Sequence, residues 1–433
     1  MMRRTGKKSS FGISKPSGIA VLALAAGALL CAACGNDSSV QKSFLDSDSS
    51  HRDTASFDSG GGDADTSTAF DTDSYTPDDS DTPNDSDTAL HKDTDADSDG
   101  HLDPAQDCAQ PPVTQSCKDG WCTVPAGCFI FGSPDKEGNT CRSKYSETEV
   151  QVTLTRDFEI HQTPLTQEEW GKAGLPLPNP LGKFSCPSCP VTWITIYEAM
   201  AYCNVLSRQA GLSECYDLSS CTGTLGGGCP DDRLYFCDHN NTDVYICTDQ
   251  VQRYPDDPYA CDGYRLPTTA EWEYAARAGT RTATYAGDLE DDIKEACEPN
   301  AVLDSIAWHC GNVNGGANIQ GNADDQYYIP VGQKQPNAFG LYDMLGGDEE
   351  FCASTFVNKA LEQLVGKKGP LTDPAPPLEL FDKYMRVVVR GAGYAQAPCF
   401  CRSAFAYGGA QAPLRWETSG FRPVRTLNAD GTK

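Results

Sequence analysis

The chain has 433 residues and a formal net charge of −27, from 61 acidic and 34 basic residues. Because binding to nucleic-acid phosphates requires clustered lysine and arginine, this charge argues against a nucleic acid as partner. The length would allow two or three domains, but the composition changes sharply along the chain, so that only part of it is expected to fold.

The N-terminal segment predicts export and a lipid anchor. Basic residues precede an apolar run over 18–30, which is too short for a confident membrane-spanning helix, and we expect 1–33 to be a signal peptide. Residues 30–35 read Leu-Cys-Ala-Ala-Cys-Gly, which resembles the bacterial lipobox with Cys34 as the lipidated residue, although Cys31 replaces the usual leucine. Lipidation would anchor the protein to the bacterial outer membrane, on its periplasmic or surface side. A plain signal peptide cleaved nearby is the alternative.

Residues 34–107 are expected to form a disordered tether. The stretch after Cys34 holds 20 aspartates against Lys42, Arg52 and Lys92, and it has very few aliphatic residues. Such a segment cannot bury enough apolar surface to offset the entropy lost on ordering.

One run at the end of this tether has the spacing of a calcium loop. Asp95, Asp97, Asp99 and Asp103 place carboxylates around a glycine, but Gln106 stands where an EF-hand has its twelfth-position glutamate. The run resembles one thrombospondin type 3 repeat. The alternative is that an aspartate-rich composition produces this spacing by chance.

The remaining residues, 108–433, are expected to form one disulfide-rich domain. Of the 21 cysteines, 19 lie between Cys108 and Cys401, which predicts a disulfide framework with at least one cysteine outside an intrachain pair. Cys186 and Cys189 are expected to form a local bridge. A cysteine-rich insertion is expected over about 212–262, with its order dependent on disulfides.

Three helices are predicted from the same start signal, a threonine followed three residues later by a glutamate. These capping boxes are Thr166 with Glu169, Thr195 with Glu198, and Thr268 with Glu271. The third helix carries Trp272 as an aromatic anchor and is expected to end at a left-handed Gly279. Strands are predicted within 124–133, over 150–154 and, continuing the latter, over 158–162.

Several motifs together resemble the sulfatase-modifying-factor, or formylglycine-generating-enzyme-like, family. The stretch 265–277, Arg-Leu-Pro-Thr-Thr-Ala-Glu-Trp-Glu-Tyr-Ala-Ala-Arg, differs from the family signature only at Thr269. Residues 330–344 match P-V-G-x-K-x-P-N-A-F-G-L-Y-D-M, and the family's R-V-x-R-G-G-S, R-S-A and G-F-R have counterparts at 386–393, 402–404 and 420–422. The resemblance covers about 124–425.

This resemblance implies an α+β fold similar to C-type lectins, with little regular secondary structure and with calcium in several members. Catalytic members oxidise a sulfatase cysteine to formylglycine with O₂ and copper(I). Two cysteines five residues apart hold the copper, and soft thiolates suit that ion.

The chain departs from the family where this chemistry should lie. Gly393 stands in place of the family serine, and counting onward puts Gln396 at the first cysteine position and Cys401 at the second. Cys399 and Cys401 are therefore the candidate catalytic residues, since both would point to one face of a strand. The alternative is that both form structural disulfides.

A second departure is residues 346–351, Gly-Gly-Asp-Glu-Glu-Phe, where the family has G-N-V-W-E-W. The family loop contributes calcium ligands, so Glu350, which is retained, is a candidate calcium ligand. No histidine or cysteine array typical of zinc or non-haem iron is present.

The sequence therefore favours an exported, membrane-anchored lipoprotein whose domain is a non-catalytic binding or structural module with a protein or glycan ligand. The competing hypothesis is a divergent formylglycine-generating oxidase that uses copper and O₂.

Overall fold

The computed structural model describes most of the chain between residues 108 and 427. The expected signal peptide, Cys34, the tether and the calcium run from Asp95 to Asp103 lie outside the described residues, and these expectations stay predictions. The described residues are 108, 112–134, 137, 141–142, 147–178, 185–227, 243–248, 251–253, 255–290, 293–313, 320–321, 327–355, 370–375, 386–412 and 414–427.

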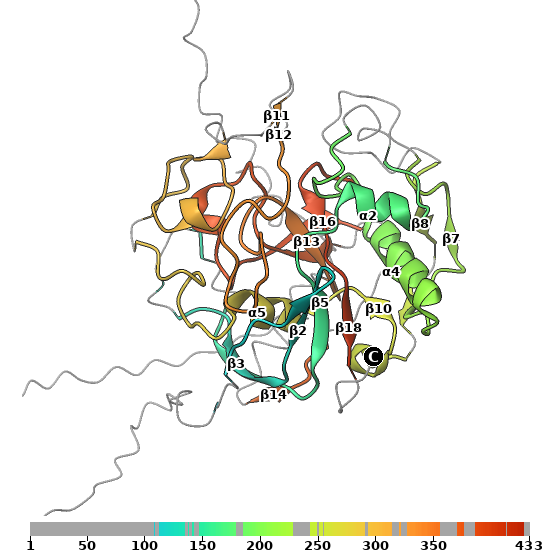
Figure 1. The fold of residues 1–433 in the computed structure, drawn as a ribbon, viewed down its shortest axis with the longest axis horizontal. Helices are drawn as coiled ribbons and strands as arrows, with labels where there is room; N and C mark the ends of the chain where they lie inside the picture. The colour runs from blue at the N-terminus through green and yellow to red at the C-terminus, as the bar shows by residue number, and fades with distance from the viewer. Residues whose placement is uncertain are drawn as a thin grey trace, which may run out of the picture. The chain divides into compact units, whose positions relative to one another are not determined.

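The three predicted helices form where their capping boxes lie (Figure 1). They are α2 (Gln167–Lys172), α4 (Ile196–Ala210) and α5 (Thr269–Arg277), and each has both reciprocal bonds of its capping box. Helix α4 ends at a left-handed Gly211, as expected from its sequence. Helix α5 ends at Arg277 with Ala278, at φ 44°, as its cap, and the predicted left-handed Gly279 follows at φ 90°.

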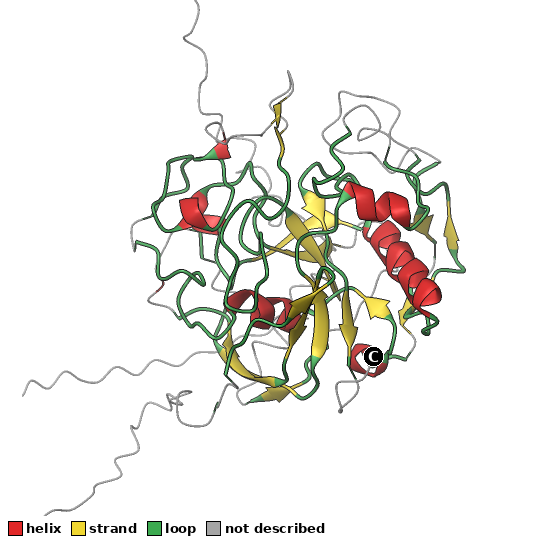
Figure 2. Ribbon diagram, in the orientation of Figure 1, coloured by secondary structure: helices red, strands yellow, loops and turns green. Residues whose placement is uncertain are grey.

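Short strands form the described sheets, and Figure 2 shows how much of the chain between them is loop. Short 3₁₀ helices lie at η2 (Pro258–Ala260), η3 (Leu303–Ser305) and η5 (Pro398–Phe400). A five-stranded sheet has the order β1 (Cys117–Lys118), β2 (Trp121–Val124), β5 (Phe158–His161), β18 (Val424–Thr426), β10 (Tyr264–Arg265). A four-stranded sheet has the order β16 (Ala406–Gln411), β15 (Arg386–Arg390), β13 (Glu349–Thr355), β17 (Ser419–Gly420).

The remaining sheets are smaller. A three-stranded sheet has the order β14 (Leu371–Thr372), β4 (Val150–Leu154), β3 (Gly127–Phe131). Two-stranded sheets pair β6 (Tyr216–Asp217) with β9 (Gln252–Arg253), β7 (Cys221–Thr222) with β8 (Ile246–Cys247), and β11 (Gln320–Gly321) with β12 (Tyr327–Tyr328). These features confirm the α+β, disulfide-rich fold.

The expectation that 158–162 continues the preceding strand is wrong. Strand β4 pairs with β3 and β14, whereas β5 pairs with β2 and β18 in another sheet. Every residue of β5 is buried, whereas β4 alternates between buried and half-buried positions, so the two strands have different surroundings.

Buried arginine–glutamate pairs join segments that regular structure does not connect. Their arginines are completely or almost completely buried, and several stand in the family-like motifs. Such pairs are costly to break from one side because the remaining charge stays desolvated. The pairs are Arg265–Glu271, Arg390–Glu273, Arg402–Glu147, Arg415–Glu198 and Arg422–Glu350.

Disulfides link the described residues both locally and over long range. Cys186 bonds Cys189, which confirms the expected local bridge, and Cys215 bonds Cys261 across the base of the expected insertion. The other described bridges are Cys108–Cys128, Cys117–Cys122, Cys141–Cys399, Cys221–Cys247 and Cys297–Cys310. Among the described cysteines, Cys203, Cys352 and Cys401 are free and buried.

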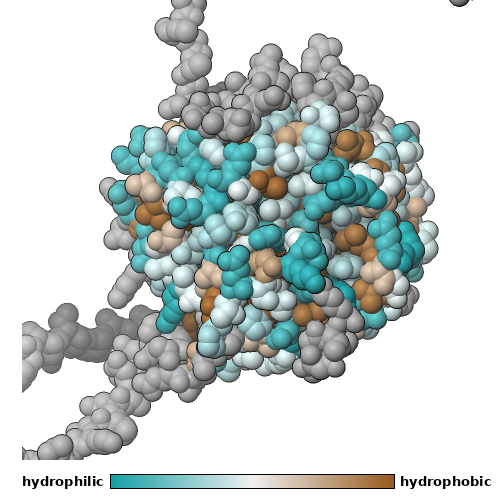
Figure 3. Space-filling model, in the orientation of Figure 1, coloured by the Kyte–Doolittle hydropathy of each residue, from teal (hydrophilic) through white to brown (hydrophobic). Residues whose placement is uncertain are grey.

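On the face shown in Figure 3, hydrophobic residues form small separate groups among hydrophilic ones. Within the described ranges, no helix is both long and apolar enough to span a bilayer.

Candidate functional site

The segment after β15 begins with a turn that has no room for the serine found in the family. A Cβ atom added at Gly393 would lie 2.9 Å from Cβ and 3.0 Å from Cγ2 of Thr418. A serine would therefore require Thr418 to move. The close packing of Thr418 against Gly393 therefore explains why the turn carries glycine in place of serine.

Gln396, at the position counted as the first family cysteine, is fixed by hydrogen bonds on both sides of its amide. Its Nε2 donates to Oε1 of Glu349 at 2.8 Å, and its Oε1 accepts from the backbone N–H of Gly393 at 3.0 Å. The side chain therefore connects the turn to the start of β13.

Cys399 and Cys401 differ in chemical state. Cys399 is bonded to Cys141, whereas Cys401 is a free thiol within the main hydrophobic core, and burial raises its pKa to about 12. The expectation that the two lie on one face of a strand is wrong. Residues 398–400 form the 3₁₀ helix η5, because Pro398 fixes a helical φ at its first position.

Glu350 sits at the centre of a buried polar junction. Its Oε2 accepts from Trp272 Nε1 at 2.8 Å and from Arg422 Nε at 2.7 Å, and its Oε1 accepts from Arg422 Nη2 at 2.6 Å. The junction joins α5, β13 and the segment before β18. Calcium binding by Glu350 stays a prediction, and it would have to compete with these bonds.

Asp348 and Glu349, the two acidic residues before Glu350, have no arginine partner among the described residues. Asp348 and Glu349 are 7% and 8% exposed, and burial is the main cause that raises both pKa values, that of Glu349 to about 7. Glu349 accepts from Gln396 and from Ser419, at 3.5 Å for the latter. For the Asp348 carboxylate, neither a hydrogen bond nor an ion pair is found within the described part of the chain.

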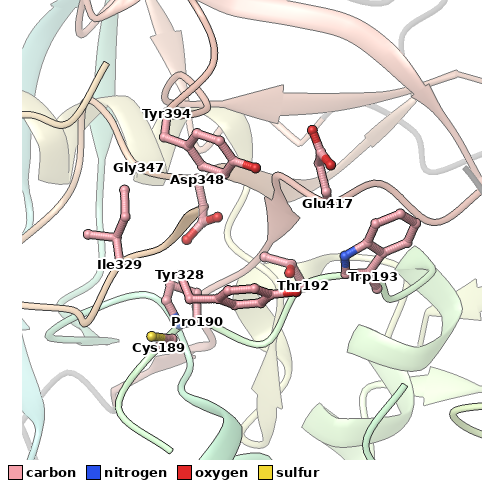
Figure 4. Close-up of a pocket in the computed structure, with 10 residues that line it drawn as sticks. All are labelled: Cys189, Pro190, Thr192, Trp193, Tyr328, Ile329, Gly347, Asp348, Tyr394 and Glu417. Carbon is pink, nitrogen blue, oxygen red and sulfur yellow. The ribbon is translucent and has the colours of Figure 1, made fainter. Parts of the chain in front are cut away.

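A pocket opens beside this acidic loop (Figure 4). Its cavity volume is about 20 Å³, room for one water-sized group, and the rest of the hollow is open to solvent. Asp348 points into it between the rings of Tyr394 and Tyr328, while Trp193 and Glu417 line the side of the pocket away from the carboxylate. Five chain segments contribute, so the pocket exists only in the folded domain.

The raised pKa of Glu349 makes stability depend on pH. Between pH 4.5 and 7 the folded state holds a proton that the unfolded state has lost, so the free energy of unfolding falls as pH rises through this range. We expect Glu349→Gln, which keeps acceptor and donor groups for Gln396 and Ser419, to remove this part of the fall and to stabilise the protein at pH 8 by about 2–3 kcal/mol.

Urea unfolding at pH 5 and pH 8 measures this effect. The matched control is Glu168→Gln, on the exposed side of α2, which should leave the pH profile unchanged. An unaltered slope in Glu349→Gln would show that Glu349 ionises as readily in the folded as in the unfolded state.

A family model described as "Sulfatase-modifying factor enzyme 1-like domain" matches residues 108–427. The chain belongs to this family. Chaperone protein LppX of Paenibacillus barcinonensis is 32% identical over 220 residues, 48% of this chain and 66% of LppX. The formylglycine-generating enzyme of Mycobacterium tuberculosis is 41% identical over 99 residues, 22% of this chain and 28% of the enzyme. The chain thus matches just under two thirds of LppX and less than a third of that enzyme.

Two solved structures are similar to this sulfatase-modifying-factor domain. Treponema denticola variable protein 1 has 23% sequence identity and a TM-score of 0.47, over 73% of this chain and 99% of that protein. PvdO from Pseudomonas aeruginosa has 21% identity and a TM-score of 0.47, over 74% of this chain and all of that protein.

The residues present do not fit the copper(I) pair of catalytic family members. That pair requires two thiolates, but here the first position is an amide engaged by Glu349, Cys399 is already bonded, and the raised pKa of Cys401 keeps it protonated. Elsewhere among the described residues, no three His, Cys, Asp or Glu side chains are grouped to hold a metal ion.

Sequence reasoning missed the pocket, although one signal pointed toward it. Asp348 and Glu349 replace the valine and a tryptophan of the family motif, and the change introduces two charges at positions that are buried. Trp193, Tyr328 and Tyr394 carried no such signal, because only the fold brings them together.

Proposed function

We propose that the protein is an exported lipoprotein, anchored through Cys34, whose sulfatase-modifying-factor domain is a binding module and not a formylglycine-generating oxidase. The observation that carries this proposal is Gln396, which stands at the first family cysteine and has both ends of its amide hydrogen-bonded. The family scaffold is retained, and the thiol pair is not.

A binding role is also supported by the open pocket lined by Trp193, Tyr328 and Tyr394. Ligand sites commonly combine a concave surface with a few convergent polar groups, and here Asp348 and Glu417 supply such groups in a small hollow. The name of its relative, chaperone protein LppX, favours a protein as the ligand of this chain over a glycan.

Activity on a peptide tests the domain's role directly. We expect no formylglycine when the purified full chain is incubated with a C-x-P-x-R peptide, Cu(I) and O₂, under conditions in which a catalytic family member converts it completely. Mass spectrometry of the peptide measures the product. Turnover that disappears in Cys401→Ser would instead establish the oxidase alternative.

Anchoring is tested by the mass of the protein isolated from membranes. A lipidated N-terminus at Cys34 supports export to the outer membrane, on its periplasmic or surface side. An unmodified N-terminus at another residue contradicts the anchor and leaves the role of the domain unaffected.

A further inference from the structure

The pocket beside β13 presents a carboxylate that lacks a counter-charge. Asp348 is 7% exposed and points into the cavity between Tyr394 and Tyr328 (Figure 4). No described side chain donates a hydrogen bond to it or pairs with it. The carboxylate of Asp348 faces the pocket and not a protein partner, so a ligand that supplies positive charge can pair with a group that is largely removed from water.

The groups around Asp348 are acidic, and after burial they are the further cause of its raised pKa, which a bound cation would lower again. Its electrostatic neighbours are the carboxylates of Asp343, Glu349 and Glu350. The guanidinium of Arg422 is already bonded to the carboxylate of Glu350. The formal charge of −27 on the whole chain adds a longer-range attraction for cations.

The residues that line the pocket favour an organic ammonium group over a metal ion. Trp193, Tyr328 and Tyr394 line it, and aromatic faces attract organic ammonium groups. Glu417 also lines the pocket and contributes to the raised pKa of Tyr328, which places its negative charge near that ring. A hard metal ion would instead require six to eight oxygen ligands.

The size of the pocket agrees with a small group. Its cavity volume of about 20 Å³ has room for one water-sized group, so the pocket can hold the ammonium head while the alkyl chain lies in the open mouth. The open mouth admits a side chain that projects from a partner.

We propose that this pocket binds a primary ammonium group, supplied by a lysine side chain or by a free polyamine, through the carboxylate of Asp348 and the surrounding aromatic rings. This inference rests on the proposed binding role and names the chemistry that the module recognises. Val and Trp occupy the positions of Asp348 and Glu349 in the family motif. The acidic side chains at these positions are therefore a feature of this chain and not of the family motif.

Isothermal titration calorimetry of the purified full chain tests the inference with three probes. They are the N-acetylated and C-amidated peptide Ala-Ala-Lys-Ala-Ala, the same capped peptide with norleucine in place of lysine, and 1,5-diaminopentane. We expect the lysine peptide to bind at least tenfold more tightly than the norleucine peptide. Binding of the diamine at a similar affinity assigns the site to free amines, and binding of the lysine peptide alone assigns it to a protein side chain.

Two variants at Asp348 provide the structural control. Asp348→Asn and Asp348→Val, the second of which restores the family residue, should each weaken binding at least tenfold. Asp256→Asn, at an exposed site outside the pocket, should have no effect. Near-UV circular dichroism verifies folding of each variant.

Equal affinity for the lysine and norleucine peptides, or unchanged affinity in a folded Asp348 variant, would overturn the inference. Absence of ammonium binding together with absence of peptide oxidation would overturn only the ligand assignment. Peptide oxidation dependent on Cys401 would overturn the proposed function itself.

Discussion

Replacing Glu350 with alanine is expected to lower the free energy of unfolding by about 3–5 kcal/mol. The substitution leaves the fully buried guanidinium of Arg422 without its counter-charge and Trp272 Nε1 without its acceptor. The loss is large because neither group can reach water while the fold is intact.

Urea unfolding with and without calcium measures this loss and separates two roles for the residue. If Glu350 acts through Arg422 and Trp272, the loss is the same in calcium and in a chelator. A loss seen only with calcium would identify it as a ligand. The exposed control Glu168→Ala, which removes an ion pair with Lys172 on α2, should cost no more than about 1 kcal/mol.

Removing the disulfide between Cys141 and Cys399 is expected to have the next largest effect. The bridge joins residues 258 apart, and the entropy of the unfolded chain rises with the length of the loop that is released. We expect the double variant Cys141→Ala/Cys399→Ala to lose about 4 kcal/mol, somewhat less than a loop of this length would give alone, because other bridges shorten it.

The matched control is Cys186→Ala/Cys189→Ala, which removes a bridge between residues only three apart. Its expected loss is about 2 kcal/mol. Urea unfolding under non-reducing conditions compares the two. Equal losses would show that the long bridge is not formed in the native protein or does not constrain the unfolded chain.

Local structure was predictable from sequence where neighbouring residues determine it. The pair Thr268 and Glu271 satisfies the first backbone groups of α5 without help from the rest of the chain, and the same holds at the start of α2 and α4. Helix η5 also has a local signal, because Pro398 fixes a helical φ at its first position.

Long-range partners were not predictable in this way. The family-like motifs contain Arg265, Arg390, Arg402 and Arg422, but only the fold shows that each pairs with a buried glutamate. These motifs are therefore characteristic of the family because their arginines form buried ion pairs that stabilise the fold. The sequence of α5 identifies the fold and carries no information on catalysis.

Cysteine pairing and the pocket depend on the same long-range geometry. The spacing of 19 cysteines leaves connectivity open, so the bond from Cys399 to Cys141 could not be deduced. The pocket at Asp348 is lined by residues from five separate segments. Its aromatic residues indicate a binding site only because the fold places them in one pocket with that carboxylate.

The thiol state of the segment after β15 tests the central claim most directly. Purified protein is alkylated without reduction, digested and analysed by mass spectrometry. We predict a disulfide-linked peptide pair that contains Cys141 and Cys399, with Cys401 unbonded and alkylated only after unfolding. Detection of Cys399 and Cys401 as two reactive thiols in the folded protein would contradict the account, because they would then be available as a copper-binding pair.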